Sequence, residues 1–314
     1  MGQKLTRNNH YISQFYIKEF YGDSSCLWIY DKEKDNYFKN VAQNIFYKKD
    51  MNITTINGVE NDEIEKMQAL LEGKIKVNFE EVKSFIDSWD EHTKISCKNM
   101  ELLIWFAYFT FWRNPQTDKL YDSIKDGIDV DLVLRILDQY FMIQIQKDGR
   151  DDFGSLFKRM LLPYIMLEDK SVVQRIVKNS RIIGTKEPSL LNDFPIICYG
   201  KKNFSKYIGE VEFIFSDFVF PITKNLVFIY SENCAWNEID VLLHSGSIGN
   251  ITVELFTEFL SYFRDTALFI NAERFVCCED ENRLKKIQKI SGKEILIFVY
   301  LRYFKEIIRK KQCF

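Results

Sequence analysis

His10 is the side chain of this sequence best suited to proton-transfer chemistry. An imidazole has the unperturbed pKa nearest to neutrality, so a positioned histidine can act as a general base or a general acid. His10 opens a segment, residues 10–20, that is dense in aromatic and aliphatic side chains. Because chain ends fray unless they are anchored, so apolar a segment predicts docking against the body of the fold. The alternative is a structural role, in which the ring only anchors the segment by a hydrogen bond.

Two carboxylates, Glu65 and Glu72, are predicted to project from one face of a helix, because seven residues make almost two turns. Such a pair could bind a divalent metal ion or divide acid and base roles. A solvated helix edge is the alternative. No His-Glu-x-x-His motif accompanies the pair. We therefore expect neither a metal ion nor another cofactor.

Arg113 follows a run of almost wholly apolar residues that is predicted to be a buried helix. A guanidinium in that position requires a carboxylate, the last carbonyls of the helix or an anionic ligand. Asp217, next to a predicted strand, could cap a turn or pair with Arg113 or Arg274. Asn271 and Arg274, on a predicted late helix, could complete a polar cluster.

Convergence of these side chains would produce a mixture of histidine, carboxylate and arginine like that of metal-independent phosphodiesterases. The base would remove a proton and the arginines would hold the phosphate. The predicted catalytic residues are His10, Glu65, Arg113 and Asp217, and the predicted binding residues are Gln14, Glu72, Asn271 and Arg274.

The elements that must position these residues are mixed in type. Residues 27–30 and 37–38 flank a polar turn and predict a hairpin. Helices are predicted over residues 59–88, 94–113, 116–146, 153–178, 252–277 and 293–311. Short strands over residues 182–183, 196–199, 211–215 and 226–230 predict a small antiparallel sheet, with Pro188, Pro195 and Pro221 at turns.

This pattern predicts an α+β fold, predominantly α, in which a helical core packs with a small antiparallel sheet. The predicted division is residues 1–180, with the N-terminal segment, hairpin and helical core, and residues 181–314, with the sheet and the last helices. A single integrated domain of residues 1–314 is the alternative.

The composition is that of a folded protein, with 46% hydrophobic and 28% charged residues. The 43 basic and 45 acidic residues give a net charge of −2, so no global basic field attracts nucleic acid, although a local patch still could. Seven cysteines without regular spacing predict free thiols in a reducing compartment. The first residues lack the apolar core of a secretory signal, and no apolar run approaches the ~20 residues that span a bilayer. We expect a cytoplasmic protein without a membrane partner.

The opening segment resembles the bacterial family called domain of unknown function 4238. That family begins His-Tyr-apolar-Pro-x-Phe-Tyr-Leu-x-x-Phe, and here Ser13 stands where the family has proline. The residues that match are His10, Tyr11, Ile12, Phe15, Tyr16, Ile17 and Phe20. Shorter similarities include the pair Glu65 and Glu72, the Arg113-Asn114-Pro115 helix end, Asp217, Asn271 and Arg274, so the resemblance extends from residue 10 to about residue 278. It implies little about activity, although some members of the family look similar to bacterial defence or toxin-like proteins.

Two functions are compatible with these residues. The first is a nuclease-like or nucleotide-directed effector in defence or toxin function, with RNA, DNA or a nucleotide as its partner. The second is a non-catalytic binding or sensor protein that recognises a protein or nucleic-acid partner. In the first case the candidate residues should line one site, and in the second they should be dispersed or held in structural pairs.

Overall fold

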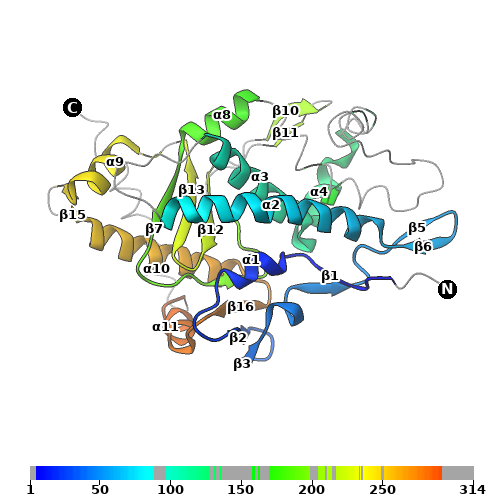
Figure 1. Cartoon of the computed structure of the whole chain (residues 1–314), viewed down its shortest axis with the longest axis horizontal. Coiled ribbons are helices and arrows are strands. Elements are labelled where there is room, and N and C mark those ends of the chain that lie inside the picture. The colour runs from blue at the N-terminus through cyan, green and yellow to red at the C-terminus, as the bar shows by residue number, and fades with distance from the viewer. Residues whose placement is uncertain are drawn as a thin grey trace. The chain divides into compact units, whose positions relative to one another are not determined.

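The computed structural model of the 314-residue chain describes residues 5–87, 97–127, 131, 135, 158–159, 162, 170–198, 204–208, 211–213, 217–232, 234, 236–248 and 251–291. The chain divides into two compact units, and each unit combines segments that are distant in the sequence (Figure 1). The first unit comprises Met1–Ser13, Phe46–Val177 and Lys201–Phe215. The second comprises Gln14–Ile45, Lys178–Gly200 and Ser216–Phe314. Within the described residues, no helix combines the length and the apolar character needed to cross a membrane.

The first unit opens with two pairs of short antiparallel strands. β1 (Asn8–His10) pairs with β4 (Tyr47–Lys49), and β5 (Thr54–Ile56) pairs with β6 (Val59–Asn61). Asn57 and Gly58, which join β5 to β6, both have positive φ angles. An Asn-Gly pair with this backbone is typical of a two-residue hairpin turn. The helix predicted from residue 59 therefore begins later, because residues 59–61 complete the hairpin.

Two long helices follow, α2 (Glu63–Asp87) and α3 (Cys97–Arg113). The predicted periodicity of α2 holds for Ile64, Met67, Leu71 and Ile75, which are buried, whereas Leu70 and Val77 are exposed. Phe79 of α2 meets Phe106 of α3 edge to face, with ring centroids 5.6 Å apart. α3 is buried almost all round and ends before Asn114-Pro115, as predicted, because proline disfavours helix at the preceding residue.

The rest of the first unit is described in shorter pieces. These are η2 (Pro115–Thr117), α4 (Asp118–Ile124), η3 (Lys125–Gly127), β10 (Phe204–Ile208), β11 (Val211–Phe213) and α8 (Lys170–Lys178), whose last residue belongs to the second unit. β10 and β11 form an antiparallel pair. Most of the helices predicted over residues 116–146 and 153–178 lies outside the described residues.

The second unit contains two four-stranded antiparallel sheets. The first has the order β3-β2-β16-β8, and its hairpin of β2 (Leu27–Asp31) and β3 (Asn36–Asn40) confirms the predicted one. β16 (Phe275–Cys278) pairs with both β2 and β8 (Leu191–Asn192). The prediction of a small sheet therefore underestimated the strand content, although the mixed α+β class is confirmed.

The second sheet has the order β7-β13-β12-β9. Its strands are β7 (Ser180–Gly184), β13 (Leu226–Ser231), β12 (Asp217–Thr223) and β9 (Ile197–Cys198). Pro221, predicted to mark a turn, lies within β12. Among the described residues β9 pairs only with Phe218 and Val219, so at Pro221 no second described strand requires an N–H donor from β12.

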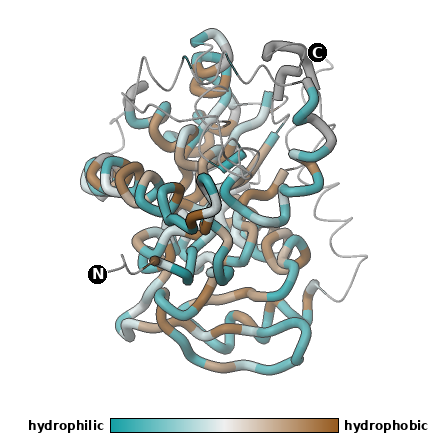
Figure 2. Tube along the Cα trace, turned by 90° about the vertical axis from the view of Figure 1, so that its right-hand side faces the viewer, coloured by the Kyte–Doolittle hydropathy of each residue, from teal (hydrophilic) through white to brown (hydrophobic). Residues whose placement is uncertain are grey.

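Helices cover these sheets with apolar faces. They are α1 (Gln14–Lys18), η1 (Ala42–Asn44), α9 (Trp236–Ser245), α10 (Val253–Asn271) and α11 (Glu281–Ser291), and β14 (Ser247–Ile248) and β15 (Ile251–Thr252) form a further pair. The buried core combines Leu260 and Leu268 of α10 with Leu284 and Ile287 of α11 and with apolar strand residues. Along the trace, hydrophobic and hydrophilic stretches alternate, as expected of elements with one buried face (Figure 2).

The helix predicted over residues 252–277 is wrong at its C-terminal end. α10 ends at Asn271, Ala272 takes an extended backbone, and residues 275–278 form β16. The carboxylate of Asp193 accepts the backbone N–H groups of Glu273, Arg274 and Phe275, which redirects the chain. The helix predicted over residues 293–311 lies outside the described residues, and the sequence analysis missed α9 and α11.

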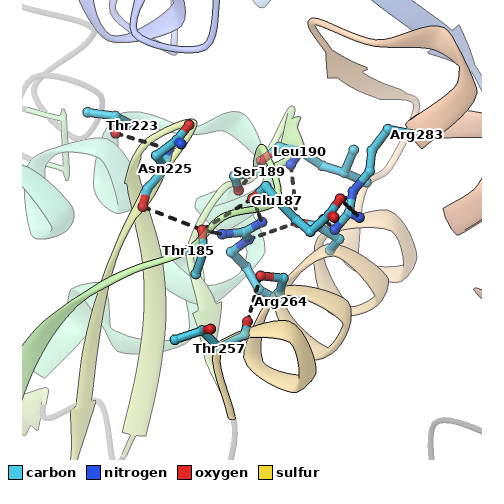
Figure 3. Close-up of polar contacts among 11 residues, drawn as sticks. Thr185, Glu187, Ser189, Leu190, Thr223, Asn225, Thr257, Arg264 and Arg283 are labelled. Carbon is cyan, nitrogen blue, oxygen red and sulfur yellow. Dashed lines mark hydrogen bonds and ion pairs between the residues drawn. The ribbon is translucent and has the colours of Figure 1, made fainter. Parts of the chain in front are cut away.

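A buried ionic network connects α10, α11 and the loop after β7 (Figure 3). Asp265, which is fully buried, accepts from Nε of Arg264 at 2.8 Å and from Nε of Arg283 at 3.1 Å. Arg264 also donates to Thr185 Oγ1, and Arg283 donates to Glu187. Asp265 thus pairs with both buried guanidinium groups, and hydrogen bonds occupy all three nitrogens of each.

Replacing Asp265 should strongly destabilise the second unit. Asp265→Asn leaves two buried guanidinium groups without their shared carboxylate, and we expect the free energy of unfolding to fall by about 3–5 kcal/mol. Glu258→Gln, an exposed carboxylate on the same helix, is the matched control. Chemical denaturation measures both variants, and equal small losses would contradict a central role for Asp265.

Candidate functional site

The N-terminal segment of the first unit, here residues 9–13, is largely buried and is held by backbone pairing. Asn9 and Ser13 are buried, and His10 is 8% exposed. The His10 ring lies 5.7 Å from the Tyr47 ring across the β1–β4 pair, measured between centroids. The N–H of Tyr11 donates to the carbonyl of Phe46 at 3.0 Å. The predicted docking of this segment is therefore present within the first unit, and His10 has a defined position.

Glu65 receives hydrogen bonds from two asparagines. Nδ2 of Asn9 donates to Glu65 Oε2 at 3.0 Å, and Nδ2 of Asn52 donates to the same oxygen at 2.8 Å. Asn52 also donates its backbone N–H to Oδ1 of Asn9 and a side-chain N–H to Oε1 of Gln68. Asn52 therefore connects the N-terminal segment to helix α2.

Glu72, two turns further along α2, forms a second anchor. Its Oε1 accepts from Ser13 Oγ at 2.8 Å and from Nη1 of Arg113, which is 2% exposed. The same Nη1 lies 3.3 Å from Ser13 Oγ, and the guanidinium stacks on Phe109. Both predicted glutamates thus face the N-terminal segment, and Arg113 at the end of α3 joins one of them. The carboxylate that a buried guanidinium requires is supplied by Glu72.

Two cations missed by the sequence analysis, Lys158 and Arg159, join this network. Lys158 Nζ donates to the carbonyl of Asn114 at 2.9 Å and pairs with the carboxylate of Asp118. Arg159 Nη1 donates to the carbonyl of Met51 and, at 3.2 Å, to Oδ1 of Asn52. The sequence did carry a signal for these two residues, because Lys158 and Arg159 lie within an apolar run, Leu156 to Leu162. Charged side chains in a run that is buried must find partners.

Burial lowers the pKa of both cations. Desolvation lowers the pKa of Lys158 to about 8, although its hydrogen bond to Asp118 acts in the opposite direction. Desolvation also lowers the pKa of Arg159, and the positive charge of Arg113 contributes in the same direction. The first unit therefore contains three buried cations, Arg113, Lys158 and Arg159. Asp118 lies within ion-pair distance of Lys158 and Arg159, and the charge of Arg113 acts on Arg159.

The remaining predicted residues belong to the second unit. Asp217, the first residue of β12, is buried, and its Oδ1 accepts the backbone N–H of Glu232 at 2.9 Å. Burial raises the pKa of Asp217. Gln14 begins α1 and is half-buried. Asp217 therefore binds the backbone just beyond the end of the neighbouring strand β13.

Asn271 and Arg274 lie at the end of α10 and just beyond it. Nδ2 of Asn271 donates to the carbonyl of Phe194 at 3.0 Å. Arg274 pairs with Asp31 at 2.9 Å and with Glu33 at 3.1 Å. The hydrogen bonds from Arg274 lower the pKa of Asp31. These two residues hold loops and strand ends of the second unit in place.

The candidate residues of the first unit, Glu65, Glu72 and Arg113, thus gather on the segment that carries His10. Among the described residues, no group of three or more histidine, cysteine, aspartate or glutamate side chains is arranged to hold a metal ion. The arrangement offers donors from arginine, lysine and asparagine, which suits an acceptor-rich ligand.

Comparison with known proteins gives one result. A family described as a protein of unknown function (DUF4238) matches residues 8–238, which include β1, α2 and α3. No curated protein and no solved structure matches the chain.

Removing the Glu72 carboxylate should loosen the anchor of the N-terminal segment. Glu72→Gln leaves Arg113 buried without its carboxylate partner, and we expect a loss of about 1–3 kcal/mol in the free energy of unfolding. Glu81→Gln, exposed on the same helix, should change stability little. Urea denaturation tests this, and a loss no greater than that of Glu81→Gln would exclude a role for the pair in stability.

Lys158 should make the protein more stable as pH rises. Its pKa is about 8 in the folded state and 10.5 in the reference state, so between these values the unfolded chain binds more protons. The cost of burying the ammonium is present below pH 8 and declines above it, by about 1–2 kcal/mol between pH 7 and pH 9.5. Denaturation of wild type and Lys158→Met at both pH values measures the difference. A difference independent of pH would contradict the lowered pKa.

Proposed function

The chain belongs to the DUF4238 family of proteins of unknown function, and we propose that it is a nucleotide- or phosphodiester-directed protein whose site lies in the first compact unit. The observation that carries this proposal is the gathering of Glu65, Glu72 and Arg113 on the segment that holds His10. An arginine that contacts the segment carrying a histidine suits a phosphate-bearing ligand better than a cationic or apolar one.

In the catalytic form of this proposal, His10 is the general base. It removes a proton from water as the water oxygen forms a bond to phosphorus, and the bond from phosphorus to the leaving oxygen breaks. The leaving oxygen takes a proton from solvent. Arg113 stabilises the negative charge that develops on the phosphate oxygens. Asp217, Gln14, Asn271 and Arg274 belong to the second unit, and the proposal does not depend on them.

A non-catalytic binding or sensor function is the second candidate, and one observation favours it. Asn9 and Asn52 already bind Glu65, and Ser13 and Arg113 already bind Glu72, as expected of carboxylates that position a segment and do not react. In that form, the same unit recognises the phosphate-bearing partner without cleaving it.

Inducible expression in bacteria separates the two forms. An effector active against nucleic acid or nucleotides should arrest growth, and His10→Ala should abolish the arrest while the purified variant stays folded by circular dichroism. His244→Ala, at an exposed histidine on α9, is the matched control and should behave like wild type. The purified proteins are then incubated with RNA, DNA and nucleoside triphosphates, and the products are resolved by chromatography.

The outcomes assign the function directly. Cleavage that requires His10 supports the catalytic form. Binding without cleavage, unchanged by His10→Ala, supports the sensor form. Neither binding nor cleavage of any of these three substrates would overturn the proposal.

A further inference from the structure

The most informative feature outside the predicted set is the incomplete hydrogen bonding of buried donors in the first unit. Nε of Arg159, Nε of Arg113 and Nε2 of Gln68 are buried and have no hydrogen-bond acceptor among the residues that the structure describes. The Gln68 residue is fully buried, and the two arginine side chains are 7% and 2% exposed. A buried donor without an acceptor has lost its hydrogen bonds to water without replacing them, so three in one unit require an explanation.

The donors of Arg159 that have no acceptor lie on the edge of the guanidinium that typically binds carboxylates and phosphates. Its hydrogen bonds within the described part of the chain all use Nη1, which leaves Nε and Nη2 without one there. A guanidinium binds carboxylates and phosphates in bidentate fashion through two such parallel N–H groups. The same holds for Arg113, whose hydrogen bonds to described residues also use Nη1 alone.

These donors are connected to one another. Arg159 and Gln68 both bond the side-chain amide of Asn52, at 3.2 and 2.8 Å. They therefore lie on opposite ends of one small side chain. Lys158, adjacent in sequence to Arg159, adds a buried ammonium.

Asp118 lies on the solvent-exposed side of the cluster formed by Gln68, Lys158 and Arg159. Its carboxylate pairs with Lys158 and lies 4.0 Å from Nη2 of Arg159, too far for a hydrogen bond. Its side chain is 46% exposed, whereas those of Lys158 and Arg159 are almost fully buried. A carboxylate on the solvent side of two buried cations is in the position that an incoming anion would take.

We propose that Arg159, Lys158 and Gln68 form an oxyanion subsite for a phosphate group, and that Asp118 occupies it in the absence of ligand. This inference deepens the proposed function and rests on it, since it names the part of the site that holds the phosphate. The unsatisfied groups of Arg159 and Gln68 are donors, and a phosphate offers three or more acceptor oxygens where a carboxylate offers two. The phosphate displaces the Asp118 carboxylate and receives the open edge of Arg159.

Titration calorimetry at constant ionic strength tests this subsite, with inorganic phosphate, adenosine monophosphate and a short single-stranded oligonucleotide as probes. Arg159→Gln should weaken binding at least about tenfold, because it removes a charged bidentate donor. Asp118→Asn should tighten binding several-fold, because the competing carboxylate is lost. A merely structural role for Asp118 predicts the opposite, weaker binding through a less stable fold.

Two control variants carry matched changes of charge. Asp126→Asn removes an exposed carboxylate from the neighbouring η3, and Arg135→Gln removes an exposed arginine, and both should bind like wild type. Should Arg159→Gln fail to fold, Arg159→Lys keeps the charge without the bidentate edge and should still lose affinity. Tighter binding of the oligonucleotide than of adenosine monophosphate assigns the phosphate to a nucleic-acid backbone, and the reverse order assigns it to a free nucleotide.

Two results would overturn the subsite. One is wild-type binding of a probe that folded Arg159→Gln retains in full, and the other is the absence of binding to all three probes. The proposed catalysis fails separately: His10→Ala keeps the subsite, so phosphate binding without any hydrolysis would contradict the catalytic form alone.

Discussion

The first unit depends on two carboxylates of α2 that hold the N-terminal segment. Glu65 and Glu72 are two turns apart, and the side chains that bind them, Asn9 and Ser13, are four residues apart in the segment. This match of spacing lets a short peptide lie along a helix with its polar groups satisfied. His10 lies between the two anchors in the sequence, so its position follows from theirs.

Buried charge is used differently in the two units. In the second unit, Asp265 balances Arg264 and Arg283, and every guanidinium nitrogen has a partner. Such a network fixes one packing arrangement of α10 and α11. In the described part of the first unit, Arg113 and Arg159 keep donors without acceptors. We interpret the complete network as structural and the incomplete one as the place where a ligand completes the hydrogen bonds.

Local sequence signals predicted the elements whose causes are local. The β2–β3 hairpin follows from β-prone runs around a polar turn, and the end of α3 follows from Asn114-Pro115. The common face of Glu65 and Glu72 follows from helical periodicity alone. The Asn57-Gly58 turn was also readable, since Asn-Gly is a strong hairpin signal, and it would have corrected the start of α2.

The structural features that the sequence did not predict depend on long-range contacts. The strand β16 depends on Asp193, about eighty residues earlier, and Pro221 lies in β12 beyond the residues that pair with the described part of β9. Lys158 and Arg159 find their partners at Asn114, Asp118 and Asn52, far from them in the sequence. No periodicity encodes such pairings, although the charged pair within an apolar run did indicate that partners must exist.

Hydrogen exchange at the Tyr11 amide, which donates to Phe46, tests the central claim most directly. We expect slow exchange in the wild type and markedly faster exchange in the double variant Glu65→Gln/Glu72→Gln, with a larger increase at Tyr11 than at the Phe109 amide of α3. Exchange of Tyr11 at the rate of an unstructured peptide in the wild type would contradict the account, because the segment that carries His10 would then not be held by α2.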